Sequence, residues 1–276
     1  MAIITLTTDF GLKDHFVGAI KGTIYRELPN VNIVDISHLI SPFNLHEAAY
    51  IIKNAYKSFP AGSVHIIGVD SELNPENKHI AVKVDNHYFI GADNGIISLI
   101  AHEYNPEQIV EINIHDYIET IFPVLDVFVK VACHIIRGGS LDVVGKPLLE
   151  IKQIKGLSPI IYQDKNQIVG NVIYIDNYGN VVTNITRKII NTHFKSRSFE
   201  LYARNYRFKK IHDRYSDFIN FNIEKHKRNI DGEKMAVYNS SGFVELAVYK
   251  SNLQTVGGAS TLLGLNYRDT ITINFE

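Results

Sequence analysis

The first half of the chain alternates short apolar runs with segments whose apolar residues recur at helical spacing. Apolar, β-branched runs predict buried strands at residues 2–7, 31–36 and 64–69. Helical spacing predicts helices at 14–27, 45–56, 96–102 and 126–137. Two further strands, 80–84 and 88–92, flank the turn residues Asp85 and Asn86. This alternation is typical of βαβ units, so we expect an N-terminal, mostly parallel α/β sandwich domain over residues 1–155.

The pattern changes after about residue 150, where helical spacing becomes scarce. Strand-like segments separated by Gly, Asn or Asp occupy residues 160–162, 167–176, 181–185, 199–203, 234–238, 243–248 and 270–275. They predict a smaller C-terminal β-barrel domain over residues 160–276, joined to the first domain near residues 155–159. Residues 209–234 are polar and mixed in charge, which favours a long surface excursion.

Composition narrows the class of protein without naming a function. The chain has 276 residues, 28 Lys and Arg against 29 Asp and Glu, and a single cysteine, Cys133. The balanced charge gives no field that would attract nucleic acid or anionic lipid. The single cysteine excludes an intrachain disulfide, and we expect neither a leader peptide nor a membrane span. We expect a soluble, cytoplasmic protein.

Several polar motifs follow the predicted strands in a fixed order. They are TDFG at 8–11, SH at 37–38, SPF at 41–43, VD at 69–70, ADNG at 92–95, IDNYGN at 175–180 and NSSG at 239–242. Each motif alone has a plain structural explanation: Asp9 suits a helix cap, Phe43 a packing position, and residues 176–180 and 239–242 suit turns. Taken together, their order and spacing resemble the SAM hydroxide adenosyltransferases, the family that includes the fluorinating and chlorinating enzymes acting on SAM.

The resemblance covers nearly the whole chain and implies an α/β domain joined to a β-barrel. It also implies a homotrimer, with SAM bound between the N-terminal domain of one subunit and the C-terminal domain of its neighbour. It implies that Asp9 holds the ribose hydroxyls and that Phe43 packs on the ligand. Asp176 would meet the methionine ammonium, Asn180 the adenine region and Ser240 the methionine carboxylate. SAM would be the substrate or ligand, with no cofactor and no metal.

The residues that activate water in this family are only partly present. Members that use water carry an Asp–Arg–His set, and Asp70 matches the aspartate as the expected catalytic residue. Asn77 stands at the arginine position, beside Lys78 and His79, and Pro123 stands at the histidine position. Proline has no side-chain donor and no N–H, so it can act neither as a base nor as a donor. We expect a pocket floor that is more apolar and less basic than in the water-using enzymes.

Three functions fit this pattern and stay open. In the first, Asp70 still activates water for attack at the 5′ carbon, helped by His79 or Lys78, and the chain hydrolyses SAM to adenosine and methionine. A histidine at a strand start, however, is by default an ordinary surface residue. In the second, the chain uses another nucleophile. In the third, it is a catalytically silent binder of adenosyl compounds.

Functions outside the family have weaker support. A basic and aromatic stretch suits single-stranded nucleic acid, and its members are Tyr206, Phe208, Lys209, Lys210, Arg214, Tyr215, Lys225, Lys227 and Arg228. Asp213, Asp217, Glu224 and Asp231 interrupt it, which favours a solvated loop. The 12 histidines form no HxH or HExxH pair, and no GxGxxG follows the first strand. We therefore expect neither a metalloenzyme nor an NAD-binding protein.

Overall fold

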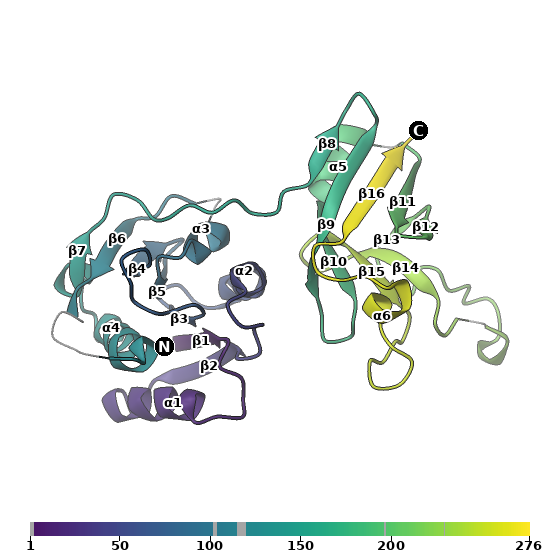
Figure 1. The fold of residues 1–276 in the computed structure, drawn as a ribbon. Coiled ribbons are helices and arrows are strands. Elements are labelled where there is room, and N and C mark those ends of the chain that lie inside the picture. Colours follow the sequence, from purple (N-terminus) through teal and green to yellow (C-terminus); the bar gives the residue numbers. More distant parts are fainter. Residues whose placement is uncertain (1–2, 102–103, 115–119, 196, 229) are drawn as a thin grey trace. The chain divides into compact units, whose positions relative to one another are not determined.

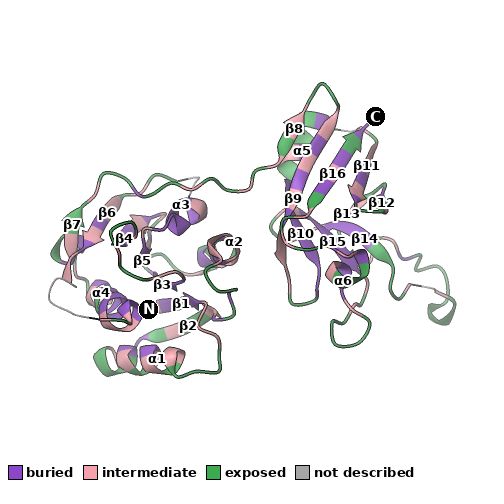
Figure 2. Cartoon of the chain, viewed as in Figure 1, coloured by how far each residue is buried: buried purple, intermediate pink, exposed green. Residues whose placement is uncertain are grey.

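The chain forms two compact units, residues 1–156 and 157–276, each with its own sheet. The computed structural model describes residues 3–101, 104–114, 120–195, 197–228 and 230–276 (Figure 1). Buried residues are concentrated on the strands of each unit (Figure 2).

The described residues of the N-terminal unit form a sheet of seven strands. In spatial order these are β2 (Asn32–Ser37), β1 (Ile3–Thr8), β3 (Val64–Gly68), β5 (His87–Ala92), β4 (His79–Val84), β6 (Gln108–Ile112) and β7 (Gly145–Pro147). The pairs from β2 to β5 are parallel, and the pairs from β5 through β4 and β6 to β7 are antiparallel. The sheet is thus mixed, and the expectation of a mostly parallel sheet is correct for one half only.

Local chemistry explains the hairpin that begins the antiparallel half. Asp85 and Asn86 both have positive φ, 52° and 60°, as a tight two-residue hairpin turn requires. The strands β4 and β5 on either side of them pair antiparallel, which confirms the predicted pair of strands. The sequence interpretation did not include β6 and β7, which extend this half of the sheet beyond β4.

Helices cover both faces of the sheet. They are α1 (Phe16–Glu27), α2 (Leu45–Ala55), α3 (Ile96–Ile100) and α4 (Val129–Ile136), the last preceded by a π-helical turn, Val124–Phe128. Neighbouring residues of β3 point to opposite faces, because side chains alternate along a strand. Ile66 joins a core with residues of α1 and α4, and Ile67 joins a second core with residues of α2 and α3. Two cores on one sheet make a three-layer sandwich.

The described residues of the C-terminal unit form nine strands around one core. They are β8 (Ile160–Tyr162), β9 (Gln167–Ile175), β10 (Val181–Thr186), β11 (Phe199–Ala203), β12 (Tyr206–Phe208), β13 (Ile211–His212), β14 (Lys234–Tyr238), β15 (Phe243–Val248) and β16 (Thr270–Phe275). Their order is β12-β11-β16-β9-β10-β15-β14-β13, with β8 paired to β9. Ile168, Val172, Val181 and Leu246 are fully buried in the core between them.

The connection between the two edge strands bends this sheet towards a barrel. β12 and β13 lie at opposite ends of the strand order, yet only Lys209 and Lys210 separate them in the chain. A residue spans at most about 3.6 Å, so the two edges of the sheet must come close together. The sheet is consequently curled into a nearly closed form.

Two short helices in this unit were missed by the sequence interpretation. They are α5 (Arg187–Phe194) and α6 (Ala259–Leu263). α5 begins where the Thr186 hydroxyl accepts from the Ile189 amide at 3.2 Å, and it buries only Ile190 and Phe194. One apolar pair four residues apart is too little periodicity to distinguish a helix from a loop. Among its described residues, the polar excursion at 209–234 contains β13, a single helical turn, Lys225–Lys227, and the first residue of β14.

Candidate active site

The parallel strands of the N-terminal unit bring four distant segments to one edge of the sheet. Strands β2, β1, β3 and β5 are neighbours and run in the same direction, so their carboxyl ends meet. The segments that follow these strands carry Phe43, Asp9, Asp70 and Asn94, respectively. In open α/β sheets this edge is where ligands bind.

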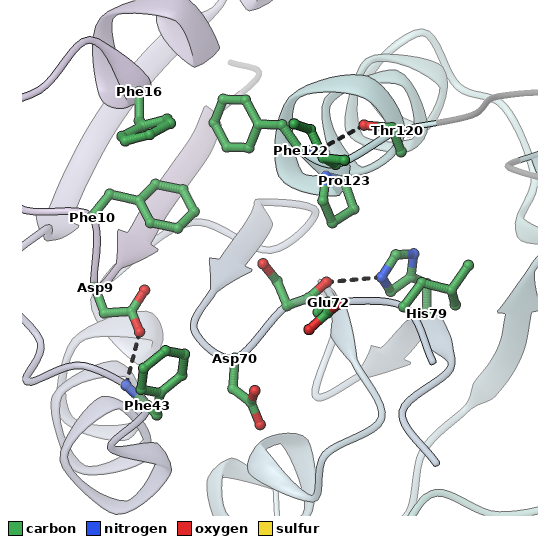
Figure 3. A pocket seen from close by; sticks show the side chains of 13 residues that line it. Asp9, Phe10, Phe16, Phe43, Asp70, Glu72, His79, Thr120, Phe122 and Pro123 are labelled. Atoms are coloured by element: carbon green, nitrogen blue, oxygen red, sulfur yellow. Dashed lines mark hydrogen bonds between the residues drawn. The ribbon is translucent and has the colours of Figure 1, made fainter. Parts of the chain in front are cut away.

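A cavity of about 460 Å³ lies at this edge (Figure 3). It is lined by Asp9, Phe10, Phe16, Phe43, Asp70, Ser71, Glu72, Leu73, His79, Thr120, Ile121, Phe122 and Pro123. Three residues singled out from separate sequence motifs, Asp9, Phe43 and Asp70, therefore line one cavity. A volume of this size is in the range of small-molecule sites.

Asp9 is held in place by the loop that carries Phe43. Its Oδ2 accepts a hydrogen bond from the Phe43 amide at 2.9 Å (Figure 3). Burial raises the pKa of the Asp9 carboxyl above 3.8, the Phe43 amide opposes that rise, and the nearby charge of Asp70 adds to it. The second oxygen of Asp9 can accept from a ligand hydroxyl, since a carboxylate offers about four lone-pair positions.

Phe43 and Asp70 both adopt a left-handed backbone conformation, with φ of 61° and 47°. This conformation is uncommon for residues other than glycine and costs of order 1–3 kcal/mol. Such strain is maintained where the surrounding structure enforces it, and it gathers at functional sites. At Phe43 it accompanies a residue that lines the cavity and is 72% exposed.

Three phenylalanine rings form one wall of the cavity. The Phe10 and Phe16 ring centroids are 5.8 Å apart, and Phe122 packs edge-on against both at 5.6 and 5.3 Å. Figure 3 shows these rings facing the side of the cavity that holds Asp9 and Asp70. The rings come from three separate segments, and sequence analysis did not single them out as site residues.

The segment that carries Pro123 is fixed by Thr120. The Thr120 hydroxyl accepts from the Phe122 amide at 2.8 Å and donates to Asp126 at 2.5 Å. Pro123 lines the cavity, so the position expected to lack a base does face the site. Its ring offers only apolar contact there.

Of the polar residues around position 77, only His79 reaches the cavity. Asn77 lies in a tight turn with Asn74, and its side-chain oxygen is 3.4 Å from the Lys152 ammonium. The Lys78 ammonium is paired with Glu111 at 2.7 Å. His79 is 1% exposed, so the default expectation of a surface histidine is wrong. It is buried because β4 pairs antiparallel with β5, which sets His79 opposite Ala92 at the ligand-binding edge.

The cavity is acidic and apolar. Asp9, Asp70 and Glu72 contribute carboxylates, and no lysine or arginine is among the described residues that line it. The lower basicity expected relative to the water-using enzymes stays a prediction. Such a site favours a cationic ligand over an anion, because carboxylates at low dielectric repel negative charge. Glu72 belongs to the loop after β3. Its position two residues after Asp70 is the one feature of the sequence that points to it as a site residue.

In the C-terminal unit, Asp176 organises the turn between β9 and β10. Its Oδ1 accepts from the amides of Tyr178 and Asn180, both at 2.8 Å, and its Oδ2 accepts from the Asn180 side chain at 3.0 Å. Gly179 in this turn has a φ of 76°. The local explanation, a turn, is therefore correct, and it aligns the side chains of Asp176 and Asn180.

A second cavity of about 370 Å³ adjoins this turn. It is lined by Tyr178, Asn180, Tyr215, Val248, Tyr249, Lys250 and Ser251. Tyr215, from the polar excursion, donates to the buried carboxyl of Glu245 at 2.6 Å. Burial raises the pKa of Glu245, and the charge of Asp176 adds to that rise while the Tyr215 hydroxyl opposes it. Ser240 lies apart from the residues that line this cavity, exposed in the turn between β14 and β15.

Comparison with known protein families shows which family this chain belongs to. Residues 4–145 match the model of the SAM hydroxide adenosyltransferase N-terminal domain, and residues 170–272 match that of its C-terminal domain. The chain belongs to the SAM hydroxide adenosyltransferase family. The resemblance inferred from the motifs is thereby confirmed.

Relatives within the SAM hydroxide adenosyltransferase family carry two kinds of name. An (R)-S-adenosyl-L-methionine hydrolase from Methanocaldococcus jannaschii is 31% identical, with 98% of this chain and 95% of that protein aligned. A protein of the same name from Salinispora arenicola is 27% identical, with 64% of this chain and 70% of that protein aligned. A fluorinase from Nocardia brasiliensis is 25% identical over 67% of this chain and 71% of its own length.

Solved structures share the fold. A conserved protein from Thermotoga maritima matches with a TM-score of 0.82 and 28% identity, covering 99% of this chain and 100% of its own. A conserved protein from Thermus thermophilus matches with a TM-score of 0.73 and 21% identity over both full lengths. Across the parts of the chain that the structure describes, no helix combines the length and apolar character needed to span a bilayer.

Proposed function

We propose that this protein hydrolyses S-adenosyl-L-methionine to adenosine and methionine, with the (R) epimer at sulfur as the substrate, as the names of its relatives indicate. The observation that supports this most directly is the cavity that holds Asp9, Phe43 and Asp70 together. In this proposal Asp9 accepts from the ribose hydroxyls, Phe43 packs on the ligand and Asp70 takes the proton of the attacking water.

The charge of the cavity supports this chemistry. A sulfonium leaves without being protonated, so the site needs a positioned water and a proton acceptor more than it needs an acid. The carboxylates of Asp9, Asp70 and Glu72 attract the sulfonium cation, and the rings of Phe10 and Phe122 offer it a polarisable wall. The same carboxylates repel a halide ion, which favours water over a halide as the nucleophile.

The C-terminal unit supplies the remaining contacts in this proposal. Asp176 meets the methionine ammonium, Asn180 hydrogen-bonds in the adenine region and Ser240 contacts the methionine carboxylate. The cavity beside Asn180 is bounded by the aromatic residues Tyr178, Tyr215 and Tyr249, which suits a planar base. We further propose a homotrimer in which SAM lies between one subunit's N-terminal unit and its neighbour's C-terminal unit.

An incubation with SAM tests the reaction. Purified protein is given the separated (R) and (S) epimers, and adenosine is followed by chromatography beside an Asp70→Asn variant. We expect adenosine from the (R) epimer and a rate about 10²–10⁴-fold lower in Asp70→Asn, the usual contribution of a general base. Asp142→Asn is the control, since that carboxylate accepts from Gln108 away from the cavity.

Calorimetry with adenosine separates the alternatives. Adenosine binding without turnover of either epimer would identify a silent adenosyl binder and reject the hydrolase. Product that forms only when a halide is added would identify the other nucleophile. Absence of both binding and turnover would reject the adenosyl site itself.

A further inference from the structure

Three consecutive backbone carbonyls around Asp70 are each held by a side chain. The Nδ2 of Asn94 lies 3.1 Å from the carbonyl oxygens of both Val69 and Asp70. The Nε2 of His79 lies 3.0 Å from the carbonyl oxygen of Ser71 (Figure 3). The segment on which Asp70 stands is thus held from two neighbouring elements, the start of β4 and the loop after β5.

Asn94 is itself locked by its surroundings. It is 5% exposed, and its Oδ1 accepts from the Ile96 amide at 3.1 Å, at the start of α3. This second bond leaves Nδ2 directed at Val69 and Asp70, because the amide plane cannot turn without losing it. A buried amide with both ends engaged is a rigid support.

His79 is equally constrained. Its ring packs edge-on against Phe128, with centroids 4.8 Å apart and planes at 81°. A carbonyl oxygen only accepts, so the Nε2 of His79 carries the proton that points to Ser71. The packing on Phe128 and the bond to Ser71 together fix the His79 ring.

These bonds act on a strained residue. Asp70 has a φ of 47°, a conformation that an aspartate leaves for a more favourable one unless its neighbours hold it. This left-handed turn follows the end of β3, and the Asp70 side chain lines the cavity. Fixing the carbonyls on both sides of that turn fixes where the carboxylate lies.

We propose that Asn94 and His79 are positioning residues that hold Asp70 in its left-handed conformation and thereby place its carboxylate against the attacking water. This inference rests on the proposed hydrolysis of SAM. His79 then contributes through the Ser71 carbonyl, as a fixed hydrogen-bond donor. By holding the Asp70 carboxylate rigidly, it compensates in part for the missing arginine and histidine, whose positions are occupied here by Asn77 and Pro123.

The test compares two substitutions at one position. His79→Phe keeps a buried ring and removes the donor, whereas His79→Gln keeps a donor at a reach similar to that of Nε2. We expect His79→Phe to lower kcat for SAM about 10–100-fold while KM and the adenosine Kd stay within about twofold, since small misplacements of a reacting group are that costly. His79→Gln should recover kcat to within about fivefold of the wild type.

Two further variants keep the test independent of folding at position 79. Asn94→Ser retains a short acceptor for the Ile96 amide and loses the reach to Val69 and Asp70, and it should show the same fall in kcat. In the Asp70→Asn background, adding His79→Phe or Asn94→Ser should lower kcat no further, because both act through Asp70.

The outcomes separate the two proposals. Wild-type turnover with an unchanged kcat in His79→Phe and Asn94→Ser would overturn the positioning role alone. Equal losses in the Asp70→Asn and wild-type backgrounds, or no recovery by His79→Gln, would show a merely structural role and overturn it as well. A wild-type protein that forms no adenosine would overturn the hydrolase and the positioning role together.

Discussion

At the scale of single residues, the site depends on carboxylates whose surroundings set their charge. Asp9 is half-buried, accepts from the Phe43 amide and faces the charge of Asp70. Burial is the largest influence and raises its pKa. The ionised form that a ribose would need is therefore lost at a higher pH than in an exposed aspartate.

This predicts a pH-dependent affinity for adenosine. The pKa of Asp9 lies above its ordinary value of 3.8. As the pH falls towards this raised pKa, the carboxylate gains a proton and adenosine binding weakens. Asp9→Asn should bind adenosine about 10–100-fold more weakly at neutral pH, the worth of a hydrogen bond to a charged group. Its affinity should also lose the acid dependence. Calorimetry from pH 7 to 4 measures both, and an equal pH dependence in the two proteins would contradict the prediction.

At the scale of elements, the parallel half of the sheet contains a buried polar ladder. The Thr5 hydroxyl of β1 lies 2.7 Å from Nδ1 of His65 on β3, and Nε2 of His65 lies 3.1 Å from Nδ1 of His87 on β5. Tyr56 packs edge-on against both histidine rings. Burial lowers the pKa of His65 to about 3, with the neighbouring His87 adding to the effect.

The ladder predicts acid sensitivity of the N-terminal unit. The unfolded chain binds a proton at His65 below about pH 6.5, whereas the folded chain does so only near pH 3. The free energy of unfolding therefore decreases as the pH is lowered from 6.5 to 3. We expect His65 to lower the free energy of unfolding by about 2 kcal/mol at pH 5 relative to pH 7.

Urea unfolding of wild type and His65→Gln at both pH values measures this cost. The variant should lose about 2 kcal/mol less than the wild type over this interval. His226→Gln, at an exposed histidine, should behave as the wild type does. The same pH dependence in all three proteins would contradict the prediction.

At the scale of the whole molecule, exposed apolar side chains lie in the lining of the N-terminal cavity and in the loops that follow β1 and β2. Phe43 and Ile121 line it, and Leu12 and Leu39 lie in the loops after β1 and β2. Leu39 is 67% exposed and Ile121 is fully exposed. Such clustering at one functional edge is typical of a surface that another chain covers.

This surface supports the proposed homotrimer and gives it a test. Light scattering after size exclusion should return three times the 31.2 kDa mass of one chain. Leu39→Glu should shift the protein towards the single-chain mass, because a buried charge without a partner is costly. Leu149→Glu is the matched control. This exposed residue follows β7, which lies at the other end of the strand order from β2. A wild-type protein that runs as one chain would reject the homotrimer.

The sequence alone determined the strands β1, β2 and β3, the hairpin β4–β5 and the motifs that carry Asp9, Phe43 and Asp70. These features depend on neighbours in the chain. Short apolar, β-branched runs favour buried strands, and Asp85 and Asn86 favour a hairpin turn, through neighbours in the chain alone. The family resemblance rests on the same local motifs, taken in order.

Only the tertiary structure decided the places of β6 and β7 and the surroundings of Asp70. β6 and β7 find their places by pairing with strands distant in sequence, which no local pattern encodes. His79 shows the physical reason most clearly. Its sequence neighbours are those of a surface residue, and its burial and its bond to Ser71 arise from the pairing of β4 with β5 and from the edge-on contact with Phe128. Burial and support depend on contacts between distant segments, so they follow from the folded arrangement and not from the local pattern.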